Sequence, residues 1–311
     1  MKVVVTGALG HIGSHVIRQL PMQFPGAEIV MIENMMTQRY PSLFNLPAVG
    51  RYRFIEGDVT RMKLEPVFAG AKVVVHLAAI TDAAGSFDKA QLVESNNYEA
   101  TARIAEACLA TGARLIAPSS TSVYGTQDGV VSEDCGRDEL KPQSPYAETK
   151  LKEEDLLRGL KSKGLKFITC RFGTIFGTAP GMRFHTVVNK FCWQAVMGQP
   201  LSVWRTAYEQ KRPYLDLADA SRAINHIISS DLFDGEIYNV LTLNAAVRQI
   251  VDAIREFVPE LEVAFVDNRI MNQLSYEVTR SRFEGTGFVF SGDLRRGVGE
   301  TIALLRQANA A

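Results

Sequence analysis

A short apolar run at the N-terminus leads directly into three evenly spaced glycines, and this feature constrains the fold more than any other. The run is 2–6 (KVVVT), and the glycines are Gly7, Gly10 and Gly13. In a strand–turn–helix unit, the first glycine permits a tight turn, the second lets backbone approach a pyrophosphate, and the third lets helix pack against strand. Free N–H groups at the helix N-terminus would face the phosphates. An ordinary glycine-rich turn is the alternative.

The N-terminal half alternates short β-branched runs with helical patterns. Such alternation predicts a doubly wound parallel sheet, the Rossmann fold, over residues 1–176. The run at 72–79 is almost wholly apolar, as a strand buried on both faces should be. The predicted strands are 2–6, 29–33, 52–58, 72–79, 114–120 and 166–173, and the predicted helices are 12–20 (stopped by Pro21), 86–111 and 145–163.

The pattern loosens after residue 176. Residues 177–311 are expected to form a smaller, mixed α/β, mainly substrate-binding region, with segments such as 236–241 returning to the main sheet. The expected helices are 183–197, 218–229, 245–257 and 299–308, and 201–205 is expected to be extended.

Composition excludes several kinds of partner. Lysine plus arginine equals aspartate plus glutamate at 34 each, so neither nucleic acid nor an anionic membrane is expected as a partner. Neither a signal peptide nor an apolar stretch of ~18 residues is visible, which predicts a cytoplasmic protein. The four cysteines lack metal-ligand spacing, so we expect no metal site.

Tyr146 and Lys150 lie four residues apart at the head of a helix-forming run, SPYAETKLKEEDLL. This spacing places the phenol and the ammonium on one helix face. A phenol beside a fixed cation can lose its proton more easily than an isolated tyrosine. The pair is therefore a candidate general acid/base for an alcohol or sugar hydroxyl.

Two acids and a histidine lie within or at the ends of predicted strands. Glu33 ends the second strand, where a carboxylate can accept hydrogen bonds from a ribose and repel a 2′-phosphate, favouring NAD over NADP. A solvated strand-end acid is the alternative. Asp58 is expected either to cap a helix or to meet an adenine. His76, in an apolar strand, is interpreted as a core histidine rather than a catalyst.

Together these residues resemble the extended short-chain dehydrogenase/reductase superfamily, in its nucleotide-sugar epimerase/dehydratase branch (UDP-glucose 4-epimerase-like). TGALGHIG matches TGxxGxxG, PSSTSVYG matches the SS-x-x-VYG strand end, and PYAETK matches PYxxxK. GDV, HLAA, NYEAT and KRPYLDLAD resemble further family segments in the same order, so the resemblance covers nearly the whole chain.

The resemblance implies roles for individual residues. The implied catalytic residues are Ser120, Tyr146 and Lys150. The implied NAD-binding residues are Gly7, Gly10, His11, Ile12, Gly13, Glu33, Asn34, Asp58, Val59, Leu77, Ala78, Ala79, Thr81, Asn97, Tyr146 and Lys150. The substrate candidates are Thr121, Thr174, Arg183, His185, Asn189 and Arg212, the last for a phosphate; His185 is equally well explained as a helix-surface or core residue.

Departures from the family pattern narrow the reaction. Thr121 and Ser122 stand where the dehydratases place Asp-Glu, which disfavours 4,6-dehydration. Thr174 replaces an asparagine that commonly faces the substrate diphosphate, and Pro213 replaces the aspartate after Arg212. These changes leave the identity of the nucleotide sugar open.

The resemblance therefore implies an NAD-dependent epimerase of a nucleoside-diphosphate sugar, acting at C4 through a transient 4-keto intermediate. One alternative is a net oxidoreductase, either a 4-dehydrogenase or 4-ketoreductase or an enzyme oxidising another alcohol. Another is a catalytically silent NAD-binding sensor or scaffold. The resemblance also implies a homodimer through helices 86–111 and 145–163. Leu92, Ala100, Ile104 and Ala107 form a stripe that fits either that interface or the core.

Overall fold

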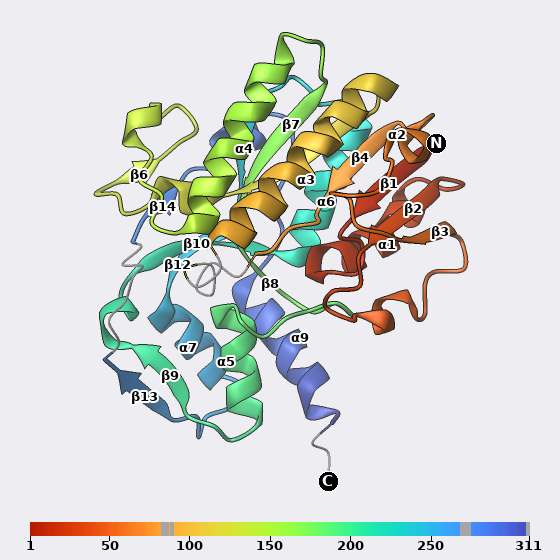
Figure 1. Ribbon diagram of the computed structural model, residues 1–311. Helices are drawn as coiled ribbons and strands as arrows, with labels where there is room; N and C mark the ends of the chain where they lie inside the picture. The colour runs from red at the N-terminus through yellow and green to blue at the C-terminus, as the bar shows by residue number, and fades with distance from the viewer. Residues whose placement is uncertain (82–86, 88–89, 268–274, 309–311) are drawn as a thin grey trace.

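A seven-stranded parallel sheet forms the centre of the protein in the computed structural model, which describes residues 1–81, 87, 90–267 and 275–308 (Figure 1). Its strand order is β11-β7-β5-β4-β1-β2-β3, and every pairing is parallel, as the sequence predicted. The strands are β1 (Lys2–Thr6), β2 (Glu28–Glu33), β3 (Arg51–Glu56), β4 (Val73–His76), β5 (Arg114–Ser120), β7 (Phe167–Phe172) and β11 (Ile237–Val240).

Helices cover both faces of this sheet. On one face, α1 (His11–Gln23) and α6 (Leu217–Ser230) pack against β1 residues Val3 and Val5. On the other, α2 (Glu65–Phe68), α3 (Ala90–Thr111) and α4 (Pro145–Lys161) pack against Val4 and its neighbours. Because the central strands are buried on both faces, their sequences are continuous apolar runs rather than alternating ones.

Residues 177–308 contribute most of a second, smaller layered region (Figure 1). Its core joins Phe176, Phe191 and Ile250. Residues 236–241 were expected to return to the main sheet, and β11 does so by pairing with β7. The boundary at residue 176 stays a prediction. The elements are β8 (Thr174–Phe176), α5 (Val187–Val196), β9 (Leu201–Trp204), β10 (Lys211–Asp216), β12 (Leu243–Ala246), α7 (Val247–Arg255), β13 (Val263–Val266) and α9 (Leu294–Arg306).

Short elements complete the chain. They are the 3-10 turns η1 (Tyr40–Leu43), η2 (Thr121–Tyr124), η3 (Arg137–Glu139) and η4 (Arg205–Ala207), the paired strands β6 (Val130–Val131) and β14 (Glu277–Val278), and α8 (Ser281–Glu284). No helix in the described ranges is long and apolar enough to cross a membrane.

Several predicted helix limits were wrong. α1 continues through Pro21, because a proline in the last turn removes only its own hydrogen bond, and Phe24 N still donates to Leu20 O at 2.8 Å. α5 begins at Val187 rather than at residue 183. α9 begins at Leu294, five residues before the expected residue 299, where the Asp293 side chain accepts from Arg296 N at 2.7 Å. The helix now labelled α3 was expected to begin at residue 86, and residues 86, 88 and 89 lie outside the described residues.

Candidate active site

A cavity of about 640 Å³ opens at the carboxyl ends of the parallel strands. It is lined from the main sheet by residues such as Gly7 and Ser120, and from the second region by residues such as Trp204 and Arg212. This edge is where open α/β sheets bind their ligands, and the volume suits a large small molecule.

The glycines of the first turn leave no space for side chains. Gly7 has a φ of +64°, and a Cβ on it would lie 2.6 Å from the backbone of Leu77 and Ala78. A Cβ on Gly13 would lie 2.3 Å from the carbonyl oxygen of Gly7. This close packing of β1, the turn and α1 brings the N-terminus of α1 to the cavity wall, as a dinucleotide pyrophosphate requires.

The Glu33 carboxylate is held in place at the end of β2. It accepts from Leu9 N at 3.3 Å and from Asn34 N at 3.2 Å. Burial raises its pKa, and these N–H groups and the nearby Arg39 oppose that rise. Asp58 closes the turn after β3, where its carboxylate accepts both the N–H and the hydroxyl of Thr60.

Most residues predicted for the cofactor do line the cavity. The lining includes Gly7, Gly10, His11, Ile12, Gly13, Glu33, Asn34, Asp58, Val59, Leu77, Ala78, Ala79, Thr81, Tyr146 and Lys150. Asn97 differs from the prediction, because it is buried behind the wall and does not line it. Its amide accepts from Ile80 N at 2.8 Å and donates to Ile80 O at 2.9 Å, and it thereby supports the segment after β4.

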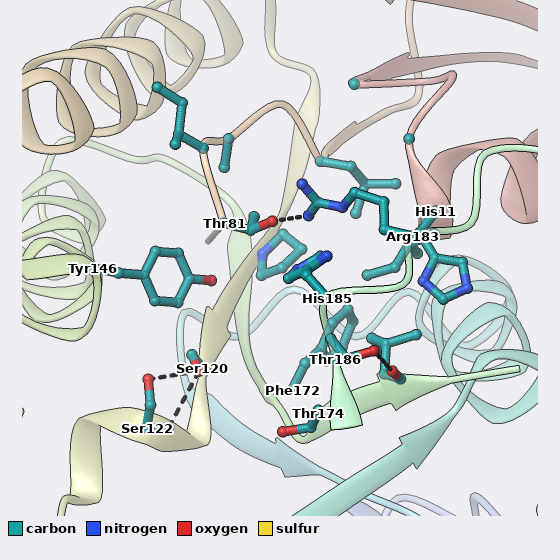
Figure 2. Close-up of a pocket in the computed structure, with 18 of the residues that line it drawn as sticks. His11, Thr81, Ser120, Ser122, Tyr146, Phe172, Thr174, Arg183, His185 and Thr186 are labelled. Carbon is teal, nitrogen blue, oxygen red and sulfur yellow. Dashed lines mark hydrogen bonds between the residues drawn. The ribbon is translucent and has the colours of Figure 1, made fainter. Parts of the chain in front are cut away.

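Tyr146 and Ser120 reach the cavity from neighbouring elements. Tyr146 lies in the first turn of α4, which is capped by the Ser144 hydroxyl accepting from Ala147 N at 3.2 Å. Ser120 ends β5, and its Oγ lies 2.8 Å from Ser122 Oγ. Figure 2 shows the Tyr146 hydroxyl directed toward the centre of the cavity, with Ser120 below it.

Lys150 lies one turn after Tyr146, and its Nζ is 5.9 Å from the centre of the phenol ring. Its ammonium donates to Glu153 Oε2 at 2.8 Å. Burial acts to lower the pKa of Lys150, but the charges of Glu153 and Tyr146 outweigh it, so the net pKa is raised. Lys150 is therefore a cation at neutral pH.

The pKa of Tyr146 is raised and not lowered. Burial raises it, and although Lys150 acts in the expected direction, it does not overcome the burial and the opposing charge of Glu153. Part of the Tyr146 side chain remains open to the cavity. The groups of the protein itself thus keep the phenol protonated at neutral pH.

Most residues predicted for the substrate also reach the cavity. Thr121, Thr174, Arg183, His185 and Arg212 all line it. Arg183 donates to the Thr81 hydroxyl across the cavity, and Figure 2 shows Arg183 and His185 on the wall facing Tyr146.

Asn189 differs from the prediction, because it is fully buried and does not line the cavity. Its amide accepts from Gly177 N at 3.3 Å and donates to Arg183 O at 3.1 Å. It therefore fixes both ends of the loop that precedes α5.

That loop, residues 177–183, crosses the glycine-rich turn. His11 Nε2 lies 2.8 Å from Gly177 O, and Gly181 N donates to Ser14 Oγ at 3.0 Å. Arg39 donates to Gly181 O. A Cβ on Gly181 would lie 2.2 Å from Leu9 O, so only glycine allows this approach. Sequence reasoning missed Arg39 and Gly181, which lie far apart in the chain.

Two strands of the sheet separate the acidic lining residues from Ser120. Among the described lining residues the carboxylates are Glu33 and Asp58, at the ends of β2 and β3. β1 and β4 lie between those strands and β5. The end of the cavity that holds Ser120 and Tyr146 thus presents hydroxyls and cations.

His76 is buried with both ring nitrogens in contact with hydroxyls. Burial lowers its pKa to about 3, so the ring is neutral. Burial likewise lowers the pKa of His11 to about 4. Within the described part of the chain, no three His, Cys, Asp or Glu side chains are grouped to hold a metal ion.

Comparison with known proteins places the chain in a family. The model of the NAD dependent epimerase/dehydratase family matches residues 3–240. The chain belongs to this family. NAD is accordingly its cofactor, as Glu33 and the glycines predicted, and the glycine-lined turn and Glu33 would hold it.

Two curated relatives illustrate the range of reactions. The chain is 30% identical to an uncharacterized UDP-glucose epimerase, YtcB, of Bacillus subtilis over 250 residues, covering 77% of this chain and 76% of that protein. It is 28% identical to RHM2 of Arabidopsis thaliana, a trifunctional UDP-glucose 4,6-dehydratase, epimerase and reductase, over 92% of this chain. The chain spans only 44% of the length of RHM2.

Solved structures share the whole fold. MoeE5 in complex with UDP-glucuronic acid and NAD has a TM-score of 0.85 and 28% identity, covering 99% of this chain and 100% of MoeE5. UDP-glucuronic acid 4-epimerase from Bacillus cereus, also in complex with UDP-glucuronic acid and NAD, has a TM-score of 0.86 and 25% identity, with the same coverage.

Proposed function

We propose that this enzyme is an NAD-dependent epimerase of a nucleoside-diphosphate sugar, acting at C4 through a 4-keto intermediate. The observation that carries the proposal is the composition of the cavity around Tyr146. Among the described residues, those that line the cavity near Tyr146 carry a phenol and small hydroxyls. The acidic residues of the lining lie at the ends of β2 and β3. A 4,6-dehydration needs an acid to protonate the leaving hydroxyl, and Thr121 and Ser122 cannot replace it.

A UDP-sugar is the proposed substrate class. Lys190 and Arg212 lie in the cavity wall contributed by the second region and could bind a diphosphate. Two similar structures hold UDP-glucuronic acid. The cationic Arg183 facing Tyr146 makes a uronic acid a substrate to test beside neutral hexoses.

In the proposed mechanism, Tyr146 takes the proton of the sugar 4-hydroxyl and later returns it. Bound NAD supplies a reversible hydride acceptor. Ser120, whose Oγ is held by Ser122, donates a hydrogen bond to the same sugar oxygen. Lys150 stabilises the phenolate form of Tyr146 that accepts this proton. Lowering a tyrosine pKa from ~10 to ~7 takes about 4 kcal/mol. Because burial and Glu153 raise the pKa of Tyr146 against the effect of Lys150, the positive nicotinamide of bound NAD would have to contribute to this shift.

The loop at 177–183 favours epimerisation over net oxidation or reduction, because it would help to retain the cofactor. An epimerase must keep its cofactor through both hydride transfers. The loop at 177–183 crosses the glycine-rich turn and is tied to His11, Ser14 and Arg39. A dinucleotide beneath such a loop would dissociate slowly.

The test is to incubate the purified protein with UDP-glucose, UDP-glucuronic acid, UDP-N-acetylglucosamine and GDP-, CDP- and dTDP-sugars without added NAD, and to identify products by NMR. A C4 epimer without net absorbance at the reduced-nicotinamide band supports the proposal. A 4-keto-6-deoxy product or a net requirement for added NAD contradicts it. Bound NAD with no product from any sugar favours the sensor or scaffold alternative.

We also propose a homodimer through α3 and α4, which lie side by side in Figure 1. Of the predicted stripe, Ala100, Ile104 and Ala107 pack in the chain's own core. Leu92 and Tyr98 remain exposed on α3 and would form the contact. Light scattering on the wild type and on Leu92→Asp tests this, because a monomeric wild type would contradict it.

A further inference from the structure

A buried carboxylate that the proposed mechanism does not use lies next to the catalytic pair. Glu153, on α4, accepts from Lys150 Nζ at 2.8 Å, and the two side chains are only 6% and 7% exposed. The same oxygen, Oε2, accepts from Thr101 Oγ1 of α3 at 2.9 Å. The other oxygen, Oε1, is buried without a hydrogen-bond partner. The negative charge of Glu153 is therefore balanced mainly by the ammonium of Lys150.

The contacts continue from Glu153 into the sheet. Thr101 Oγ1 lies 3.3 Å from His76 Nε2, and His76 Nδ1 lies 2.8 Å from Thr6 Oγ1. Because Thr101 uses its proton on Glu153, His76 must donate from Nε2 and accept at Nδ1. A neutral imidazole satisfies this pattern. The Glu153 side chain is thus fixed by a hydrogen-bonded chain that runs through α3 and β4 to β1.

Other charged groups near the pair do not replace Glu153. Glu154, the next residue, is occupied by Arg171 of β7 in two hydrogen bonds, at 3.0 and 2.7 Å, and accepts from Ser119 at 2.6 Å. Arg183, on the facing loop, carries the same sign as Lys150. With the protein's own groups alone, the remaining titratable neighbours, Tyr146 and His76, are neutral at pH 7.

A buried lysine without a counter-ion loses its proton readily, in documented cases with a pKa as low as about 5–6. We propose that Glu153 is a positioning residue that keeps Lys150 protonated and fixed beside Tyr146, and so sets the upper pH limit of the reaction. The expected effect on the pH limit of the reaction rests on the proposed roles of Tyr146 and Lys150. The expected effect on the protonation of Lys150 can be measured without a substrate.

The first test measures Lys150 directly. Protein labelled with ¹³C at lysine Cε is titrated by NMR with its cofactor bound, and Lys150→Arg assigns the signal. We expect Lys150 of the wild type to titrate above ordinary lysine, about 10.4, and Glu153→Gln to move its midpoint down by about 2 units or more. A wild-type midpoint below the ordinary value, or an unmoved midpoint in Glu153→Gln, overturns the proposal.

The second test is the pH profile of kcat. Glutamine keeps the shape of Glu153 and its acceptor for Thr101 but removes the charge. We expect activity of Glu153→Gln to fall about tenfold or more at pH ~9 and much less at pH ~6.5, with KM little changed. The substitution also removes a charge that raises the pKa of Tyr146, but the loss of the Lys150 cation should outweigh this at alkaline pH. Glu153→Asp, which keeps a carboxylate, should recover part of the alkaline activity. A uniform loss at all pH values would mean a merely structural role.

Glu94→Gln is the matched control. It removes an acid that forms an ion pair with Lys152, and Lys152 lies on the same helix as Lys150. The side chains of this pair are about half exposed. We expect no change in the Lys150 midpoint or the pH profile. If Glu153→Gln does not fold, the wild-type titration still decides the point. If the sugar panel yields no epimer but Lys150 behaves as expected, only the proposed function fails.

Discussion

The two ends of the cavity are built in different ways. The cofactor end is formed by backbone turns after β1, β2 and β3, where Gly7 and Gly13 leave no room for a side chain. The sugar end is formed by side chains from separate segments, such as Ser120, Thr174 and Arg212. The first is fixed by sterics and tolerates little change. The second can change its chemistry while the fold stays intact, and substrate specificity should therefore reside there.

The largest effect is expected at the cofactor end. Gly13→Ala places a Cβ 2.3 Å from Gly7 O, so backbone must move. We expect loss of co-purifying NAD, loss of all activity and destabilisation of about 1–3 kcal/mol. Released NAD and thermal unfolding measure this. Gly159→Ala, a helix position with no atom within 4 Å of the new Cβ, is the control and should be neutral or stabilising. Normal NAD content in Gly13→Ala would refute the steric account.

Tyr146→Phe separates chemistry from binding. Removing the phenol oxygen should lower kcat by about 10²–10⁴ while NAD content and fold are kept, because the ring still fills its place. Steady-state kinetics and released NAD test this. Tyr40→Phe removes an exposed phenol in η1 and should retain full activity. A Tyr146→Phe enzyme with near-normal kcat would remove Tyr146 from the mechanism.

The cofactor end should also be sensitive to acid. The folded-state pKa of His11 is about 4 and that of His76 about 3, both below the ordinary histidine value of about 6.5. Their stabilising effect is present above pH ~6.5 and is lost as pH falls toward 4. The free energy of unfolding should drop by up to about 1.4 kcal/mol per pH unit per histidine. Urea unfolding at pH 7, 6 and 5 tests this, and His11→Gln should flatten the slope; an equal slope would contradict it.

The smallest effect is expected at the sugar end. Thr174→Asn introduces the asparagine that the family resemblance implies at this position. We expect a change of about 2–10-fold in the KM for the sugar nucleotide, with NAD content and stability unchanged, because Thr174 lies at the cavity wall and not in a packed turn. An effect on NAD content would show that the two ends are coupled.

The same contrast explains what the sequence could predict. The strand–glycine–helix unit, the sheet and the Tyr146–Lys150 spacing depend on residues close together in the chain, and the structure confirms their arrangement. The approach of Gly181 to Leu9 depends on segments some 170 residues apart, and no local pattern reveals it. Asn97 and Asn189 were predicted to line the cavity, but each is buried and its amide both accepts from and donates to backbone behind the wall.

Electrostatics were the hardest part to predict. The four-residue spacing correctly predicted that Lys150 would act to lower the pKa of Tyr146. It could not show that burial would outweigh the effect of Lys150 on the pKa of Tyr146. Nor could it show that the carboxylate of Glu153, one turn further along α4, would form an ion pair with Lys150. Burial is a property of the assembled fold, so a spacing in sequence gives the sign of an interaction and not the net result.

The most direct test of the central claim follows the hydrogen on the reacting carbon. A UDP-sugar that the enzyme converts is prepared with deuterium at C4 and incubated without added NAD. If Tyr146 carries the hydroxyl proton while hydride leaves and returns at C4, the epimer keeps its deuterium, and Tyr146→Phe forms almost none. Loss of that deuterium to solvent, or inversion at another carbon with C4 untouched, would contradict the account.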